Sequence, residues 1–188
     1  MKTSRSSGSP PFFKAVFAWS LLGLVGLSSL DAQTPLTNAN FQSAVNLWFD
    51  DEANATATYG HIKDWNVTGV TNMQNAFKDR ATFNEDISGW DVSNVRYMGA
   101  MFMDAQSFNQ PIGDWNTSKV AQMWNMFIRT PFNQPIGGWD ISSVTSLNQM
   151  FKHTVFNQPI ADWNTSSVTN MRKVFEGAKS FNQPIGNW

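Results

Sequence analysis

Apolar residues return with a regular period of 24 or 25 positions from residue 62 to the end of the chain. Each period has an isoleucine three places before a tryptophan, a valine five places after it, then a methionine or leucine and two phenylalanines. The tryptophans of this series are Trp65, Trp90, Trp115, Trp139, Trp163 and Trp188. Self-similarity at such a period is typical of repeat proteins, in which each unit buries its apolar face against its neighbours.

Each repeat unit contains two successive patterns. The motif Ile-x-x-Trp-x-Val alternates over a few residues and predicts a short strand with its tryptophan inward. Val95, Met98 and Phe102 then share one face of a helix, after a serine that can cap it. A Phe-Asn-Gln-Pro corner leads to the next strand, because proline suits a turn. We expect coils about 4.8 Å apart.

The sequence therefore predicts an α/β solenoid over residues 62–188. Its right-handed coils of 24–25 residues each contain a short parallel strand and a helical turn, with five full coils and a partial sixth. Residues 33–61 are not repeated and predict an N-terminal helical cap that covers the first coil. Thr37 or Asn38 can cap its helix, and four apolar residues share the inward face, namely Phe41, Ala44, Val45 and Trp48.

The first 32 residues have the pattern of a secretory signal peptide. Lys2, Arg5 and Lys14 precede an apolar run from Ala15 to Leu30, and small residues follow. A retained signal anchor is the alternative. Both interpretations place the remaining chain outside the cytoplasm, so we expect an extracellular or cell-surface protein, with no membrane insertion once the signal is removed.

Composition excludes several function classes. Thirteen basic and fourteen acidic residues give a formal charge of −1, which argues against nucleic-acid binding. The chain has no cysteine, so it has no disulfide, thiolate zinc site or cysteine nucleophile. Gly-x-Ser-x-Gly, His-Glu-x-x-His and phosphate-binding glycine loops are absent. We expect no enzyme activity, no catalytic or metal-ligating residue and no cofactor.

Several segments resemble the BspA-like family of leucine-rich-repeat surface proteins. The similar segments are Trp90-Asp-Val-Ser-Asn-Val, Met101-Phe102 and Phe108-Asn-Gln-Pro-Ile-Gly-Asp-Trp, within a resemblance that covers about residues 36–188. Ile-x-x-Trp-x-Val has the spacing of the leucine-rich-repeat core with other residues in its slots, and Leu147 is the single leucine after residue 60. The resemblance implies a secreted or surface-attached protein, of which some relatives are adhesins.

The repeated apolar and amide residues are predicted to be structural. The tryptophans occupy the central inward position, and the methionines fill space between coils. Stacked tryptophans can also hold sugars or cations, which is the alternative for this column. The asparagine of each Phe-Asn pair recurs at the corner, where a ladder of amides can satisfy backbone groups in successive coils.

Polar residues flank each tryptophan on the predicted strand. Every coil has one aspartate there, alternately before and after the tryptophan, and this alternation keeps like charges apart. The candidate binding residues are Asp64, Asn66, Asp91, Asp114, Asn116, Asp140, Asp162 and Asn164. This acidic face is either only solvated or a recognition surface for a basic protein or a divalent cation. Alternating columns favour a metal poorly, because the carboxylates do not converge.

Two functions remain open. The first is a non-catalytic binding or adhesion module that uses the polar acidic strand face to bind an extracellular protein or glycan. The second is a structural component of an envelope or extracellular layer. The sequence stops at Trp188, halfway through a predicted strand, so either the gene product is a fragment or another molecule covers the last coil. The second function would use that uncapped coil for end-to-end self-association.

Overall fold

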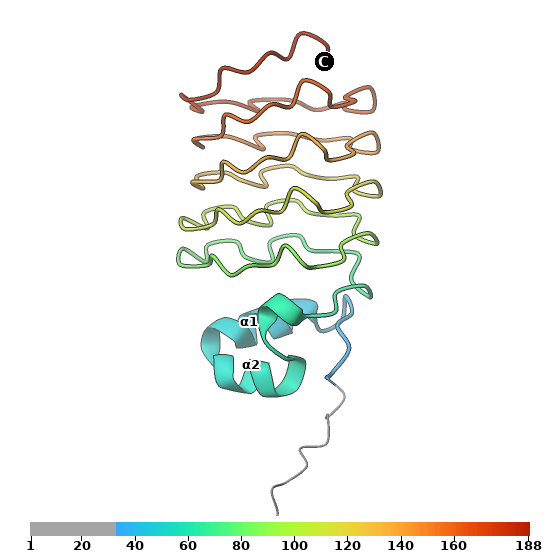
Figure 1. Ribbon diagram of the computed structural model, residues 1–188, viewed down its shortest axis with the longest axis vertical. Helices are drawn as coiled ribbons and strands as arrows, with labels where there is room; N and C mark the ends of the chain where they lie inside the picture. Colours follow the sequence, from blue (N-terminus) through green and yellow to red (C-terminus); the bar gives the residue numbers. More distant parts are fainter. Residues whose placement is uncertain (1–32) are drawn as a thin grey trace, which may run out of the picture. The chain divides into compact units, whose positions relative to one another are not determined.

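The repeats stack on one another as irregular coils, each a closed circuit of turns (Figure 1). The computed structural model describes residues 33–188, and the predicted signal peptide, residues 1–32, lies outside the described residues. The regular elements are α1 (Phe41–Asp50), α2 (Glu52–Tyr59) and a short 3-10 helix, η1 (Ile62–Asp64). Counted from the isoleucine of each motif, the full coils are 62–86, 87–111, 112–135, 136–159 and 160–184.

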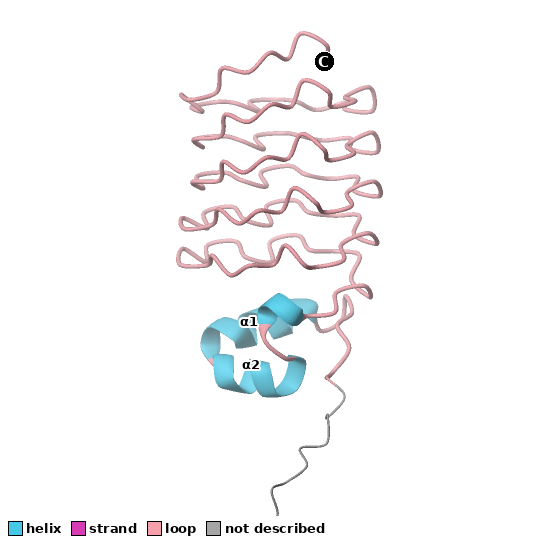
Figure 2. Ribbon diagram, viewed as in Figure 1, coloured by secondary structure: helices cyan, strands magenta, loops and turns pink. Residues whose placement is uncertain are grey.

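The predicted α/β solenoid is wrong. Within residues 33–188 the structure has no β-strand, and no helix follows η1 (Figure 2). Each pair of neighbouring coils shares a single isolated parallel bridge. These bridges are Asn72↔Tyr97, Tyr97↔Gln122, Gln122↔Ser146 and Ser146↔Asn170. The predicted leucine-rich-repeat architecture is wrong for the same reason, since that architecture has a strand in every unit.

The predicted strand at Ile-x-x-Trp is instead a turn. The amide of Trp90 donates to the carbonyl of Ile87 in its own coil at 3.1 Å, so it is not available for a ladder. The side chain makes the contact between coils: the indole Nε1 of Trp90 donates to the carbonyl of Ile62 at 2.8 Å. The same bond recurs in every later coil at 3.0–3.2 Å.

The predicted helical turn is also absent, although Val95, Met98 and Phe102 have helical spacing. Met98 N and Phe102 N donate to carbonyls of the following coil at 2.9 and 3.1 Å, not to their own chain four residues earlier. Ala100 (φ 52°) and Asp104 (φ 62°) have left-handed backbone, which a right-handed helix excludes. Equivalent left-handed residues occur in the other coils, namely Asn75, Asp79, Asn125, Arg129, Gln149, His153, Lys173 and Gly177.

These left-handed residues orient a row of peptide groups in one direction, which we call the peptide row. In the first coil every second amide donates to the second coil at 2.8–3.0 Å. The donors are Met73, Asn75, Phe77 and Asp79, and the acceptors are Tyr97, Gly99, Met101 and Met103. None of the described peptide bonds is cis, so each preceding carbonyl points the opposite way, away from the second coil.

Aromatic rings fill the interior of the stack. The repeat tryptophans Trp65, Trp90, Trp115, Trp139 and Trp163 are 3–4% exposed, which confirms that they point inward. Two phenylalanines of each coil stack face to face with ring centroids 3.8–4.2 Å apart. Equivalent rings of successive coils lie 5.6–6.3 Å apart, so two continuous columns run along the stack. This burial is the main apolar contribution to stability.

Coils of 24 and 25 residues share these columns because a threonine hydroxyl replaces a backbone carbonyl. In the 25-residue second coil, Phe108 N donates to the carbonyl of Ala105 at 3.0 Å. In the 24-residue coils, Phe132 N and Phe156 N donate instead to the hydroxyls of Thr130 and Thr154, at 3.4 and 3.3 Å. Both hydroxyls donate in turn to a phenylalanine carbonyl of their own coil.

The predicted inward face of the first helix is confirmed. Phe41, Ala44, Val45 and Trp48 are the buried residues of α1. The predicted capping residues are wrong, because the N-cap is Asn40. Asn38 joins the helix entry to the first coil: its Oδ1 accepts from Thr71 N and Asn72 N at 2.8 and 3.1 Å. Aromatic contacts, such as Trp48 with Trp65 at 6.3 Å, complete the cover.

Candidate functional site

The predicted binding residues all lie on the surface, beside buried tryptophans. We call them the flank row: Asp64, Asn66, Asp91, Asp114, Asn116, Asp140, Asp162 and Asn164, each of which is exposed. The turn that carries each buried tryptophan also presents its neighbours to solvent. The row therefore repeats with the coils, although it lies on turns and not on the predicted strands.

The members that follow a tryptophan also hold the backbone. Their side-chain Oδ1 accepts the amide N–H two residues later, at 2.9–3.2 Å. This is the Asx turn, in which aspartate and asparagine are equivalent acceptors. Sequence analysis missed this structural role, whose signal is the Asp or Asn two residues before a Ser or Thr in every unit. Five of the eight flank-row residues are thus fixed in orientation by the fold.

Asp91 and Asp140 combine this turn with a negative charge. The side chain of Ser93 and, to a smaller extent, its backbone N–H donate hydrogen bonds that lower the pKa of Asp91 below its ordinary value. Ser142 lowers the pKa of Asp140 in the same way. Both carboxylates are therefore ionised at neutral pH and are held in place by the turn.

The members that precede a tryptophan are less constrained. The carboxylates of Asp64, Asp114 and Asp162 accept no hydrogen bond from any residue within 33–188. Gly89 and Gly138 occupy this position in the alternate coils, where a Cβ would meet nothing within 4 Å. Carboxylates in this column are thus two coils, about 10 Å, apart. They cannot share one metal ion, and no cluster of metal-ligating residues occurs in the described part of the chain.

The predicted amide ladder at the corners is confirmed. Asn109 N donates to Asn84 Oδ1 at 2.9 Å, and Asn133 N donates to Asn109 Oδ1 at the same distance. The series continues as Asn157 N donates to Asn133 Oδ1 at 2.9 Å and Asn182 N donates to Asn157 Oδ1 at 2.8 Å. The side-chain oxygens of this ladder thus satisfy backbone amides of the next coil, which is the structural role that was predicted.

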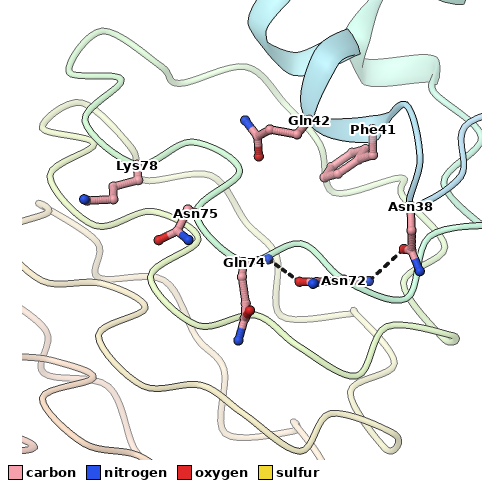
Figure 3. A pocket seen from close by; sticks show the side chains of 7 residues that line it. All are labelled: Asn38, Phe41, Gln42, Asn72, Gln74, Asn75 and Lys78. Atoms are coloured by element: carbon pink, nitrogen blue, oxygen red, sulfur yellow. Dashed lines mark hydrogen bonds between the residues drawn. The ribbon is translucent and has the colours of Figure 1, made fainter.

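Sequence analysis missed a pocket between α1 and the first coil. It has a volume of about 580 Å³ and is lined by side chains from both parts (Figure 3). The lining residues are Asn38, Phe41, Gln42, Asn72, Gln74, Asn75 and Lys78. We call this space the cap pocket. No sequence motif predicts this pocket, because its lining residues come from the unrepeated segment and from surface positions that vary between coils.

A protein family described as "Mycoplasma protein of unknown function, DUF285" matches residues 43–155 and 121–188. The chain belongs to this family. The family is part of the BspA-like group of surface repeat proteins, which confirms the resemblance at that level. No curated protein and no solved structure matches the chain. Among residues 33–188, the helices are too short or too polar to cross a membrane.

Proposed function

We propose that the chain is a secreted or cell-surface binding module without catalytic activity, which recognises a basic extracellular partner through the flank row. The observation that supports this most is the repetition of one exposed carboxylate in every full coil, in two defined columns. A partner that presents lysine or arginine side chains along an extended segment matches this arrangement. Membership of a group of surface repeat proteins supports the proposed location.

The different roles of the buried and the exposed side chains support the same proposal. Most of the tryptophans, phenylalanines and methionines of the repeats are buried, so they serve stability. The flank row is polar and exposed, and Asx turns position two of its five carboxylates, those of Asp91 and Asp140, for a partner. Such surfaces act through electrostatic complementarity, which raises association rates and selects partners by charge.

The test removes charge while leaving the turns intact. Asp91→Asn and Asp140→Asn keep the Asx acceptor, as Asn66, Asn116 and Asn164 do in the natural sequence. The neutralised chain combines these two changes with Asp114→Asn. A control chain carries Asp50→Asn, Asp79→Asn and Glu85→Gln, which remove the same charge from exposed positions outside the flank row.

Binding of both chains to an immobilised oligolysine peptide and to a panel of extracellular proteins and glycans is measured at low and physiological salt. We expect the neutralised chain to lose about tenfold in affinity and most of its salt dependence, since exposed ion pairs contribute up to about 1 kcal/mol each. An equal loss in the control chain, or none in the neutralised chain, contradicts the proposal. Concentration-dependent filaments without partner binding would instead favour a structural role in an extracellular layer.

A further inference from the structure

The cap pocket lies where the peptide row begins, and this gives it an unusual supply of hydrogen-bond acceptors. In later coils, the carbonyls of the row accept hydrogen bonds from backbone amides of the preceding coil. In the first coil no coil precedes, so these carbonyls face α1. They belong to Asn72, Gln74, Ala76 and Lys78, and three of these residues also line the pocket with their side chains.

The helix satisfies one of these acceptors. Gln42 Nε2 donates to the carbonyl of Ala76 at 3.4 Å. No residue within 33–188 donates to the carbonyls of Asn72, Gln74 or Lys78. Gln42 thus occupies the middle of the row, so a second backbone segment cannot pair continuously along it. The remaining acceptors are separate and accessible, as a small ligand requires.

The peptide row also gives this end of the stack a partial negative charge. Peptide dipoles alternate in a β-sheet and largely cancel, whereas here those of the row point the same way in successive coils. The carbonyl ends of the aligned dipoles collect at the cap pocket. Groups that donate hydrogen bonds are therefore favoured there.

The lining side chains complete the chemistry. The side-chain amides of Gln74 and Asn75 offer both donors and acceptors, and Gln42 Oε1 offers a further acceptor. The Nδ2 of Asn38 and the Nε2 of Gln42 already donate within the chain. Figure 3 shows these residues around the space, with Lys78 at one side. No carboxylate lines the pocket, and Lys78 would repel a metal ion, so the site does not suit a divalent cation. A hydroxyl group both donates and accepts, and it matches carbonyls and amides together.

We infer that the cap pocket binds a small neutral saccharide, whose hydroxyls donate to the free carbonyls of the first coil and accept from the surrounding amides and Lys78. The volume of about 580 Å³ is in the range of small-molecule sites. This inference is independent of the flank row, which lies on other turns and is acidic.

The repeat supplies a blocking variant. In the third coil, Trp124 occupies the position equivalent to Gln74, and its indole lies over Gly99 of the preceding coil. The ring fits there because Gly99 has no side chain, and it leans toward the preceding layer. In Gln74→Trp that layer is the cap, so the ring should fill the pocket. Asn148→Trp places the same residue at the equivalent position of the fourth coil, away from the pocket, and is the matched control.

The experiment titrates the full chain with glucose, galactose, mannose and N-acetylglucosamine, and follows the side-chain amide signals by NMR. We expect at least one sugar to shift the Gln42 and Gln74 signals, Gln74→Trp to weaken its binding more than about tenfold, and Asn148→Trp to leave it unchanged. Gln42→Ala provides a second variant should Gln74→Trp not fold, with an expected loss of about tenfold. Thermal unfolding verifies that each variant is folded.

Three outcomes overturn the inference. The first is the absence of any binding tighter than about 10 mM. The second is an equal effect of Gln74→Trp and Asn148→Trp, or no effect of Gln42→Ala, which would place the bound sugar elsewhere. The third is calcium chloride shifting the same signals where the sugars do not, which would make the pocket a cation site. Failure of the flank-row variants would not affect any of these measurements.

Discussion

The indole Nε1 of Trp139 donates a hydrogen bond of 3.0 Å to the carbonyl oxygen of Ile112, one coil earlier. This bond joins a buried side chain to a backbone carbonyl of the preceding coil, which also accepts the amide of Trp115. A residue selected for its apolar surface therefore also links the backbones of two coils. The motif Ile-x-x-Trp encodes both functions, since the isoleucine provides the acceptor for the tryptophan of the next unit.

Trp139→Phe should destabilise the protein by about 1 kcal/mol, because the buried carbonyl of Ile112 loses the indole donor and keeps only the amide of Trp115, at 3.3 Å. Trp139→Ala should cost about 3–5 kcal/mol through the additional cavity. Both values come from urea unfolding monitored by circular dichroism. Trp124→Phe is the control, since Trp124 is only partly buried and no residue within 33–188 accepts from its Nε1. A loss as large as that of Trp139→Phe would show that the hydrogen bond is not the cause.

Thr154→Val should destabilise the chain by about 1–3 kcal/mol, although the two side chains have nearly the same shape. The hydroxyl of Thr154 is buried, donates to the carbonyl of Phe151 at 2.9 Å and accepts from Phe156 N. Valine leaves Phe156 N without a partner, and the carbonyl of Phe151 keeps only the Thr154 amide, at 3.3 Å. Thr154→Ser retains the hydroxyl and should recover most of the loss, as measured by urea unfolding. No difference between serine and valine would rule out the proposed replacement of a backbone carbonyl.

Gly137→Ala and Gly138→Ala should differ sharply, although the two glycines are adjacent. A Cβ on Gly137 would lie 2.7 Å from the carbonyl oxygen of Pro159, at the end of the same coil, which is backbone and cannot move freely. A Cβ on Gly138 would meet nothing within 4 Å. We expect a loss of about 1–3 kcal/mol for the first change and less than about 0.5 kcal/mol for the second. Thermal unfolding of the two variants side by side provides the comparison.

Acid should weaken the fold partly through Asp91 and Asp140. Their folded-state pKa values lie below the ordinary value, because serine hydrogen bonds favour the carboxylate. This contribution to stability is therefore present above the ordinary pKa, near 4, and is lost as pH falls through the lower folded pKa. Between about pH 5 and about pH 2, the melting temperature of the double variant Asp91→Asn with Asp140→Asn should decline less than that of the natural chain.

The double variant Asp64→Asn with Asp114→Asn is the control for this pH dependence. These residues accept no side-chain hydrogen bond from the described residues, so their replacement should leave the acid response of the natural chain nearly unchanged. If the two double variants respond equally, general charge effects explain the pH dependence and the Asx turns do not.

The period, the inward tryptophans, the corner amides and the buried face of α1 could be predicted from the sequence, because they depend only on which residues are apolar and how they are spaced. The backbone between them could not. Val95, Met98 and Phe102 fit a helix by spacing, but spacing does not reveal where their amides donate. The left-handed conformations at Ala100 and Arg129 have no residue signal, whereas asparagine or aspartate at Asn75, Asp79 and Asp104 gives a weak one.

The candidate sites differ in the same respect. The flank row follows directly from the repeat, so its exposure could be anticipated from residues such as Asp91 and Asn116. The cap pocket depends on the direction of carbonyls and on the place where Gln42 of α1 meets the first coil. Neither is encoded in hydrophobic pattern, charge or motif.

The threonine at the corner of the shorter coils has a consequence for how such a gene can change. A codon lost elsewhere in a unit would shift the interior columns and turn rings toward water. At Thr130 and Thr154 a hydroxyl takes over from the missing peptide, and the following phenylalanine keeps its place. Deletions and insertions between duplicated units should therefore accumulate at this corner, and an array can drift in unit length while its layers stay aligned.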